Sequence, residues 1–150
     1  MIAAWQDAFG VALAQAVRQR PEGESLATVV ERAFIDSVSA AATPQSIALD
    51  RLIKSTETLR TRNQLKYARL EQMLADALME RATDEQDRFR ARLLAIIVIG
   101  VMRMANEDTG GGTGNNTKEI VAYTRRMFKV VWSELQELGR TATASRRVAR

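Results

Sequence analysis

The chain contains no cysteine and no histidine. Without cysteine it can form no disulfide, no thiolate nucleophile and no cysteine-ligated metal site. Without histidine it lacks the commonest general base near neutral pH and the commonest metal ligand. These absences exclude most hydrolase triads, zinc sites and Glu-x-x-His metal centres, and leave carboxylate-only chemistry as a catalytic route. We therefore expect a protein that is not an enzyme and that has no cofactor and no metal.

Long hydrophobic runs are also missing. The longest run of apolar residues and glycine, Leu93–Met102, covers ten residues, whereas a membrane-spanning helix needs about 20. The N-terminal residues MIAAWQDAFG contain no basic region followed by a long apolar core, so the sequence indicates no signal peptide. We expect no membrane contact and a cytoplasmic location.

Basic charge is concentrated near the C-terminus. The formal net charge of +4 comes from 22 basic and 18 acidic residues, and four of the arginines follow Gly139. A DNA-binding surface needs a basic patch on one element, and the formally neutral remainder of the chain offers none of that size. The sequence predicts a folded domain over residues 1–138 and a basic, disordered tail over residues 139–150.

Apolar residues recur at three- and four-residue spacing along most of the chain, and no stretch alternates with period two for the length of a strand. Pro21 and Gly23 end the first helical pattern, while Ser25, Thr43 and Asn116 are suitable N-caps for later ones. The fold class that follows is all-α. The six helices are predicted at about residues 2–20, 26–41, 44–54, 57–81, 84–107 and 117–138.

The helix predicted at 84–107 is apolar on every side through its middle, and Thr83 and Gln86 suit a capping box at its start. A helix that is hydrophobic all round is buried on more than one face. The last helix has two apolar stripes, so both helices need two packing partners. We expect a homodimer in which these two long helices of each chain form a four-helix interface; a central helix in a monomeric bundle is the other possibility. The residues assigned to the interface are Ile96, Ile99, Gly100, Arg103, Val121, Phe128, Trp132 and Leu135.

Aromatic and methionine side chains are distributed over several of the predicted helices. Such a set suits a pocket for a small ligand, because ligand sites are mostly apolar with a few polar groups and methionine adapts to varied shapes. For any single one of these residues, ordinary core packing is the better explanation, and the pocket prediction concerns the group. The candidate pocket residues are Trp5, Phe9, Phe34, Asn63, Tyr67, Met73 and Met102.

Residues 47–138 combine a short helix, the segment RLIKSTETLRTRN, a long helix, the segment DRFRARLLAIIVIGVMRMA, a glycine-rich break and a last amphipathic helix. This order resembles the C-terminal half of tetracycline-repressor-like (TetR family) transcriptional regulators. Within that family it is similar to the mycofactocin-repressor-like subgroup, although Thr56-Glu57 departs from it where a proline is usual. The resemblance implies a domain that dimerises and binds a small, largely apolar effector. The residues that fit the subgroup are Arg51, Leu52, Ile53, Ser55, Leu59, Arg60 and Arg62.

Members of that family begin with a three-helix DNA-binding domain that contains a helix-turn-helix. Nothing in this sequence matches it, and residues 1–20 resemble the helix that connects such a domain to the core. We therefore expect contact with DNA only through an N-terminal domain that is not in this chain. Two functions remain open: the effector-binding and dimerisation part of a TetR-like repressor, or a stand-alone helical interaction protein that dimerises without binding DNA itself. The sequence names neither ligand nor operator.

Overall fold

The computed structural model describes the backbone of residues 2–55, 57–107 and 116–149, and the side chains of residues 7–49, 51–52, 65–105, 116–141 and 143–149. Every regular element in these ranges is an α-helix, which confirms the predicted all-α class and the six helices. They are α1 Ile2–Gln19, α2 Leu26–Ala41, α3 Pro44–Ser55, α4 Glu57–Met79, α5 Glu85–Glu107 and α6 Thr117–Val148.

Side-chain caps set the starts of three helices where the sequence predicted them. The hydroxyl of Ser25 accepts from the backbone N–H of Thr28 at 3.2 Å at the start of α2. Before α3, the hydroxyl of Thr43 accepts from the N–H of Ser46 at 3.1 Å, and the Ser46 hydroxyl accepts from the N–H of Thr43 at 2.9 Å. At the start of α6, Asn116 accepts from the N–H of Glu119 at 3.0 Å. Each cap satisfies a backbone donor that the first helical turn leaves unpaired.

The cap of α5 lies one residue later than predicted. Asp84 accepts from the N–H of Asp87 at 2.8 Å, and the hydroxyl of Thr83 donates to the carboxylate of Asp87 at 2.8 Å. The expected pair of Thr83 and Gln86 is therefore wrong by one position. A carboxylate is the better acceptor here, because the N-terminus of a helix favours negative charge.

The end of α6 differs from the prediction of a helix that stops near Leu138 and a disordered tail after it. The helix continues to Val148. Among the described residues only Gly23 has a positive φ, so Gly139 keeps helical geometry and does not form the predicted C-cap. The residues after Gly139 are mainly alanine, arginine and threonine. Alanine and arginine are good helix formers, and Arg140 pairs with Glu137 one turn earlier. One glycine, which costs about 1 kcal/mol in a helix interior, does not break this run.

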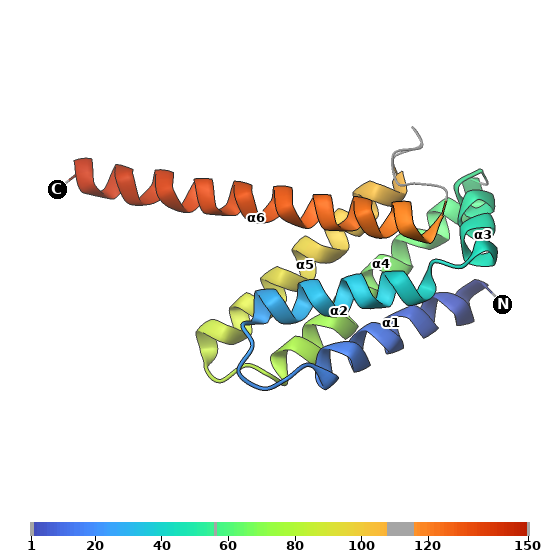
Figure 1. Ribbon diagram of the computed structural model, residues 1–150, viewed down its shortest axis with the longest axis horizontal. Helices are drawn as coiled ribbons and strands as arrows, with labels where there is room; N and C mark the ends of the chain where they lie inside the picture. The colour runs from blue at the N-terminus through green and yellow to red at the C-terminus, as the bar shows by residue number, and fades with distance from the viewer. Residues whose placement is uncertain (1, 56, 108–115, 150) are drawn as a thin grey trace.

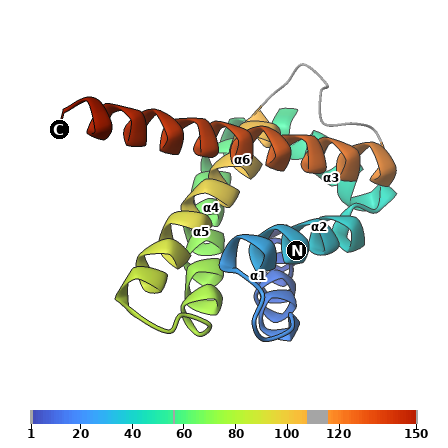
Figure 2. The same ribbon diagram turned by 60° about the vertical axis from the view of Figure 1, so that its left-hand side comes forward.

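The helices form a bundle in which α4 packs against both α5 and α1, and α2 packs against α1, α5 and α6. Figure 1 shows α6 lying across the other helices, with its C-terminal turns projecting beyond them, and Figure 2 shows α5 beside α4 and apart from α1. The core lies where α1, α2, α4 and α5 meet, and α6 contributes Phe128 to it. Its largest fully buried side chains are Tyr67, Phe128, Leu13, Leu74, Leu78, Ile99, Val17, Val29, Val30 and Val98.

Two close contacts fasten α1 to α4. Gly10 lets the helices approach, since a Cβ at this position would lie 2.9 Å from Cδ2 of Leu70 and 2.9 Å from the sulfur of Met73. Just after α4, the guanidinium of Arg81 donates to the backbone carbonyls of Val17, Arg20 and Pro21, at and after the end of α1. A cation at this end also interacts favourably with the helix dipole.

No helix among the described residues is both long enough and apolar enough to span a membrane.

Candidate functional site

Four aromatic rings form a row that connects α1, α2 and α6. Phe9 packs edge-on against Phe34 with ring centroids 6.2 Å apart, and Phe34 packs against Phe128 at 5.7 Å. Phe128 then contacts Trp132 at 5.9 Å. Phe34 and Phe128 are buried, while Phe9 and Trp132 are half-buried at the two ends of the row. Edge-on and tilted geometries are those that aromatic pairs prefer, so this row is well-packed core.

Tyr67 is not part of this aromatic row. Its side chain is 1% exposed on α4, and the guanidinium carbon of Arg103 on α5 lies 5.2 Å from the centroid of its ring. The ammonium of Lys66 lies 5.5 Å from the same centroid. Both distances are in the range of a cation–π interaction. The prediction had assigned Tyr67 to the pocket and Arg103 to the dimer interface, whereas the structure brings the two together.

The other candidate pocket residues do not converge on one point. Met73 lies against Gly10 of α1, and Met102 is half-buried against the core. The side chains of Trp5 and Asn63 lie outside the described residues. The predicted pocket therefore divides between the aromatic row and the contact of Tyr67 with Arg103.

An open groove of about 370 Å³ runs between α1 and α2 beside Phe9. Apart from Phe9, its lining consists of alanines from both helices together with Asp36 and Ser37. Its volume lies within the range of small-molecule sites, but it is a shallow surface feature lined mainly by methyl groups.

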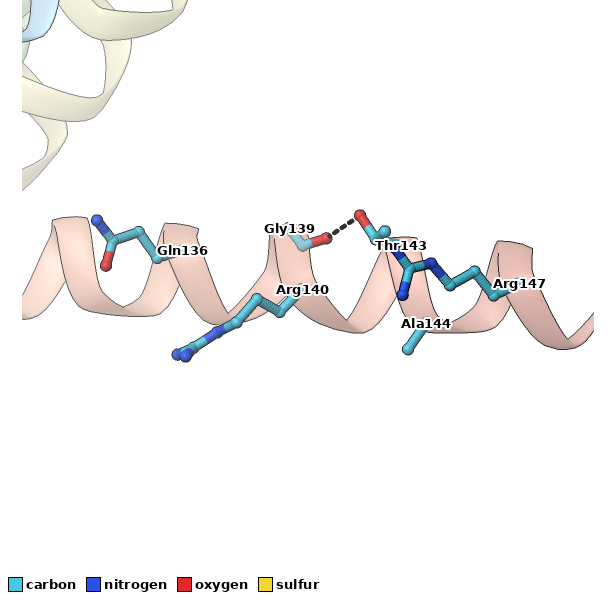
Figure 3. Close-up of a pocket in the computed structure, with 6 residues that line it drawn as sticks. All are labelled: Gln136, Gly139, Arg140, Thr143, Ala144 and Arg147. Atoms are coloured by element: carbon cyan, nitrogen blue, oxygen red, sulfur yellow. Dashed lines mark hydrogen bonds between the residues drawn. The ribbon is translucent and has the colours of Figure 1, made fainter.

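A second hollow, of about 690 Å³, follows the projecting part of α6. Figure 3 shows that all of its lining residues come from this one helix, where the Thr143 hydroxyl donates to the Gly139 carbonyl at 2.9 Å. A single helix cannot enclose a ligand, so this hollow is open surface. Its lining residues are Gln136, Gly139, Arg140, Thr143, Ala144 and Arg147.

The outward side of α5 has a continuous apolar stripe. Its members recur at three- and four-residue spacing and therefore share one face of the helix. The opposite face, with Ala91, Ala95 and Val98, is fully buried. Four of the five stripe residues are exposed, and a Cβ added at the fifth, Gly100, would meet nothing within 4 Å. We call this set the α5 outer stripe: Phe89, Leu93, Ile96, Gly100 and Met104.

The two apolar stripes predicted for the last helix take opposite roles. Val121, Phe128 and Trp132 pack against the core of their own chain. The stripe of Met127, Val131, Leu135 and Leu138 becomes more exposed along the helix, and the last two are exposed. Of the predicted interface residues, Phe128 and Ile99 are 2% and 1% exposed in one chain, so they are core residues here. Ile96, Gly100 and Leu135 remain accessible.

Three carboxylates near the turns between helices have lowered pKa values. A hydrogen bond from Arg18 lowers the pKa of Glu80 below its ordinary value, and one from Arg20 does the same for Glu24. Hydrogen bonds from Thr83 lower the pKa of Asp87. These pairs join turns and helix ends. No group of three or more acidic side chains that could hold a metal occurs among the described residues.

The described structure is thus an all-helical domain with a half-buried arginine, Arg103, next to Tyr67 and an exposed apolar stripe on α5. Residues 24–136, most of the chain, match the family of the MftR C-terminal domain. The chain therefore belongs to this family, the TetR-type C-terminal regulatory domain of mycofactocin regulators, which is not enzymatic. No curated protein and no solved structure matches the chain.

Proposed function

We propose that this domain binds a small, largely apolar effector and dimerises as part of a TetR-like transcriptional regulator, with contact to DNA made by a separate N-terminal domain. Family membership supports regulation through an effector and dimerisation as the class of function. The observation that supports this particular arrangement is the α5 outer stripe, an apolar surface with no partner within the described chain.

A second copy is the partner that fits this stripe. Ile96, at its centre, is 52% exposed. Monomeric proteins rarely expose contiguous apolar patches beyond a few hundred Å². In a two-fold dimer the same patch meets itself, which suits a uniformly apolar stripe along a straight helix. Leu135 and Leu138 of α6 are also exposed, so a second helix carries apolar residues that its own chain leaves uncovered.

The position of α5 would couple assembly to a ligand bound between α4 and α5. Arg103 lies against Tyr67 of α4, while Ile96 and Gly100 of the same helix belong to the outer stripe. A ligand that shifts α5 relative to α4 therefore also shifts the proposed dimer surface. Such an arrangement couples two sites through one rigid element, which is the requirement for an allosteric regulator.

Light scattering coupled to size exclusion tests the assembly. We expect a dimer at micromolar concentration, and a monomer with unchanged helicity for Ile96→Glu, because the substitution places two unpaired charges in a symmetric interface. Val11→Glu is the matched control, since Val11 is 47% exposed on α1, away from the stripe. A wild-type monomer, or a dimer that Ile96→Glu leaves intact, would contradict a dimer interface on the α5 outer stripe.

Binding of the neutral apolar dye phenylnaphthylamine tests the effector site. We expect one dye per chain at saturation. A stable dimer that binds no apolar probe would instead favour the stand-alone interaction protein that dimerises without an effector.

A further inference from the structure

Arg103 has a buried polar atom without a partner. Its Nε is shielded from solvent and has no hydrogen-bond acceptor in the described part of the chain. The large majority of buried side-chain polar atoms in proteins are hydrogen-bonded, and an exception calls for an explanation such as a bound water or ion. The atom is an N–H donor on a permanently charged group, so the missing partner must be an acceptor.

The described side chains around Arg103 supply no anion. Its described contact is the ring of Tyr67, with the guanidinium carbon 5.2 Å from the centroid. No Asp or Glu among the described side chains forms an ion pair with it, although six ion pairs are found elsewhere in the described chain. Lys66, 5.5 Å from the same ring, adds a second cation beside Tyr67.

Apolar residues and free space lie next to this cation. Ile99 is buried and Met102 is half-buried one turn or less from Arg103 on α5. Gly100 is a neighbour of Arg103 on the helix surface, and open space replaces its missing side chain. A group that reaches Arg103 would therefore also lie near the half-buried side chain of Met102.

We propose that Arg103 anchors the anionic oxygen group of an otherwise apolar effector, an inference that rests on the proposed effector-binding function. The guanidinium offers parallel N–H donors that match the two oxygens of a carboxylate, and charge-assisted bonds of this kind are short and strong. The contact with the ring of Tyr67, 5.2 Å from the guanidinium carbon, keeps the guanidinium beside α4. The effector class is an organic acid with a hydrophobic body.

Two fluorescent probes that differ only in the anionic group test the anchor. Anilinonaphthalene sulfonate has the ring system of phenylnaphthylamine plus a sulfonate, which shares the oxygen geometry of other oxyanions. We expect the wild-type protein to bind the sulfonate at least about tenfold more tightly than the neutral dye, a factor equivalent to about 1.4 kcal/mol. Arg103→Met should reduce this preference about tenfold and leave binding of the neutral dye unchanged. Arg92→Met, at an exposed position on the same helix, is the matched control and should keep the preference.

The thermal midpoint without ligand separates an anchor from a structural arginine. An arginine kept for a ligand has an unpaired buried donor in the free protein, so Arg103→Met should leave the midpoint unchanged or raise it. A structural arginine would lower it. Arg103→Lys keeps the charge but lacks Nε and the planar fork, and should lose most of the preference while folding normally.

The outcomes are distinct. If both dyes bind but the preference survives in Arg103→Met and Arg103→Lys, the anchor is wrong and the effector site stands. If neither dye binds the wild-type protein, both the anchor and the proposed effector binding are wrong.

Discussion

The indole nitrogen of Trp132 on α6 donates a hydrogen bond of 2.9 Å to the carboxylate of Glu31 on α2. Trp132 also contacts the ring of Phe128, which is buried against Phe34 of α2. Beyond Trp132 every described residue of α6 is exposed. This hydrogen bond therefore marks the point at which α6 leaves the body of the domain.

Loss of that hydrogen bond should loosen the docking of α6. Trp132→Phe keeps an aromatic ring but removes the donor, so we expect the free energy of unfolding to fall by about 1.5–3 kcal/mol, as for other hydrogen bonds to charged groups. Glu31→Gln retains an acceptor and should cost less. Urea denaturation followed by circular dichroism measures both. Glu134→Gln, on the exposed part of the helix, is the control, and equal effects of Trp132→Phe and Glu134→Gln would contradict this role.

The contact of Arg81 with α1 leads to a second prediction. Its guanidinium donates to three backbone carbonyls at or just after the end of that helix. Arg81→Met keeps most of the aliphatic stem but removes these donors. We expect a loss of about 2 kcal/mol in unfolding free energy, since part of the carbonyl hydration is regained in water. Chemical denaturation measures it, with Arg88→Met at an exposed position of α5 as the control. A loss no larger than that of the control would mean that the hydrogen bonds from Arg81 to α1 do not stabilise the fold.

Local sequence signals predicted the helices well because they act over a few residues. Ser25, Thr43 and Asn116 form the caps expected of them. The fifth helix starts one residue from its predicted position, because neighbouring Thr83 and Asp84 are both suitable caps and the choice depends on Asp87.

Which apolar face turns inward could not be predicted in the same way. Periodicity shows which residues share a face, but not which face meets the rest of the chain. Phe128 was assigned to the dimer interface and is buried against Phe34. The exposure of Phe89, the first residue of the outer stripe, had no signal in the sequence. The contact between Tyr67 and Arg103 depends on how α4 and α5 pack, and residues 36 positions apart have no local spacing rule.

The continuation of α6 past Gly139 gives a third prediction. A Cβ at this position would meet nothing within 4 Å, so Gly139→Ala adds helix propensity without a clash. We expect a gain of about 0.5–1 kcal/mol in local helix stability. Amide hydrogen exchange of residues 140–148 should slow several-fold. Gly23→Ala is the control in which the same substitution should destabilise the domain, because Gly23 has φ +86°, a conformation that residues with a side chain rarely adopt. Exchange at the unprotected rate in both wild type and Gly139→Ala would contradict a helix beyond Gly139 and would support the disordered tail that the sequence predicts.

Acid should weaken the start of α5 through Asp87. The Thr83 hydroxyl and N–H and the guanidinium of Arg90 stabilise its ionised form, which lowers its pKa from the ordinary value. The folded state therefore binds fewer protons at this carboxylate than the unfolded chain does. Its contribution to stability is fully present above the ordinary aspartate pKa of about 4 and is lost as the pH falls toward the folded pKa.

Asp87→Asn isolates this contribution from those of Glu24 and Glu80, whose pKa values are lowered in the same direction. Near pH 7 the variant should be less stable than wild type in urea denaturation, and the difference should shrink steadily below about pH 5. Glu85→Gln, which removes an exposed carboxylate from the same turn, controls for the general effect of charge near the helix dipole. A difference between wild type and Asp87→Asn that stays constant down to about pH 3 would show that the Thr83 contacts do not favour the ionised carboxylate.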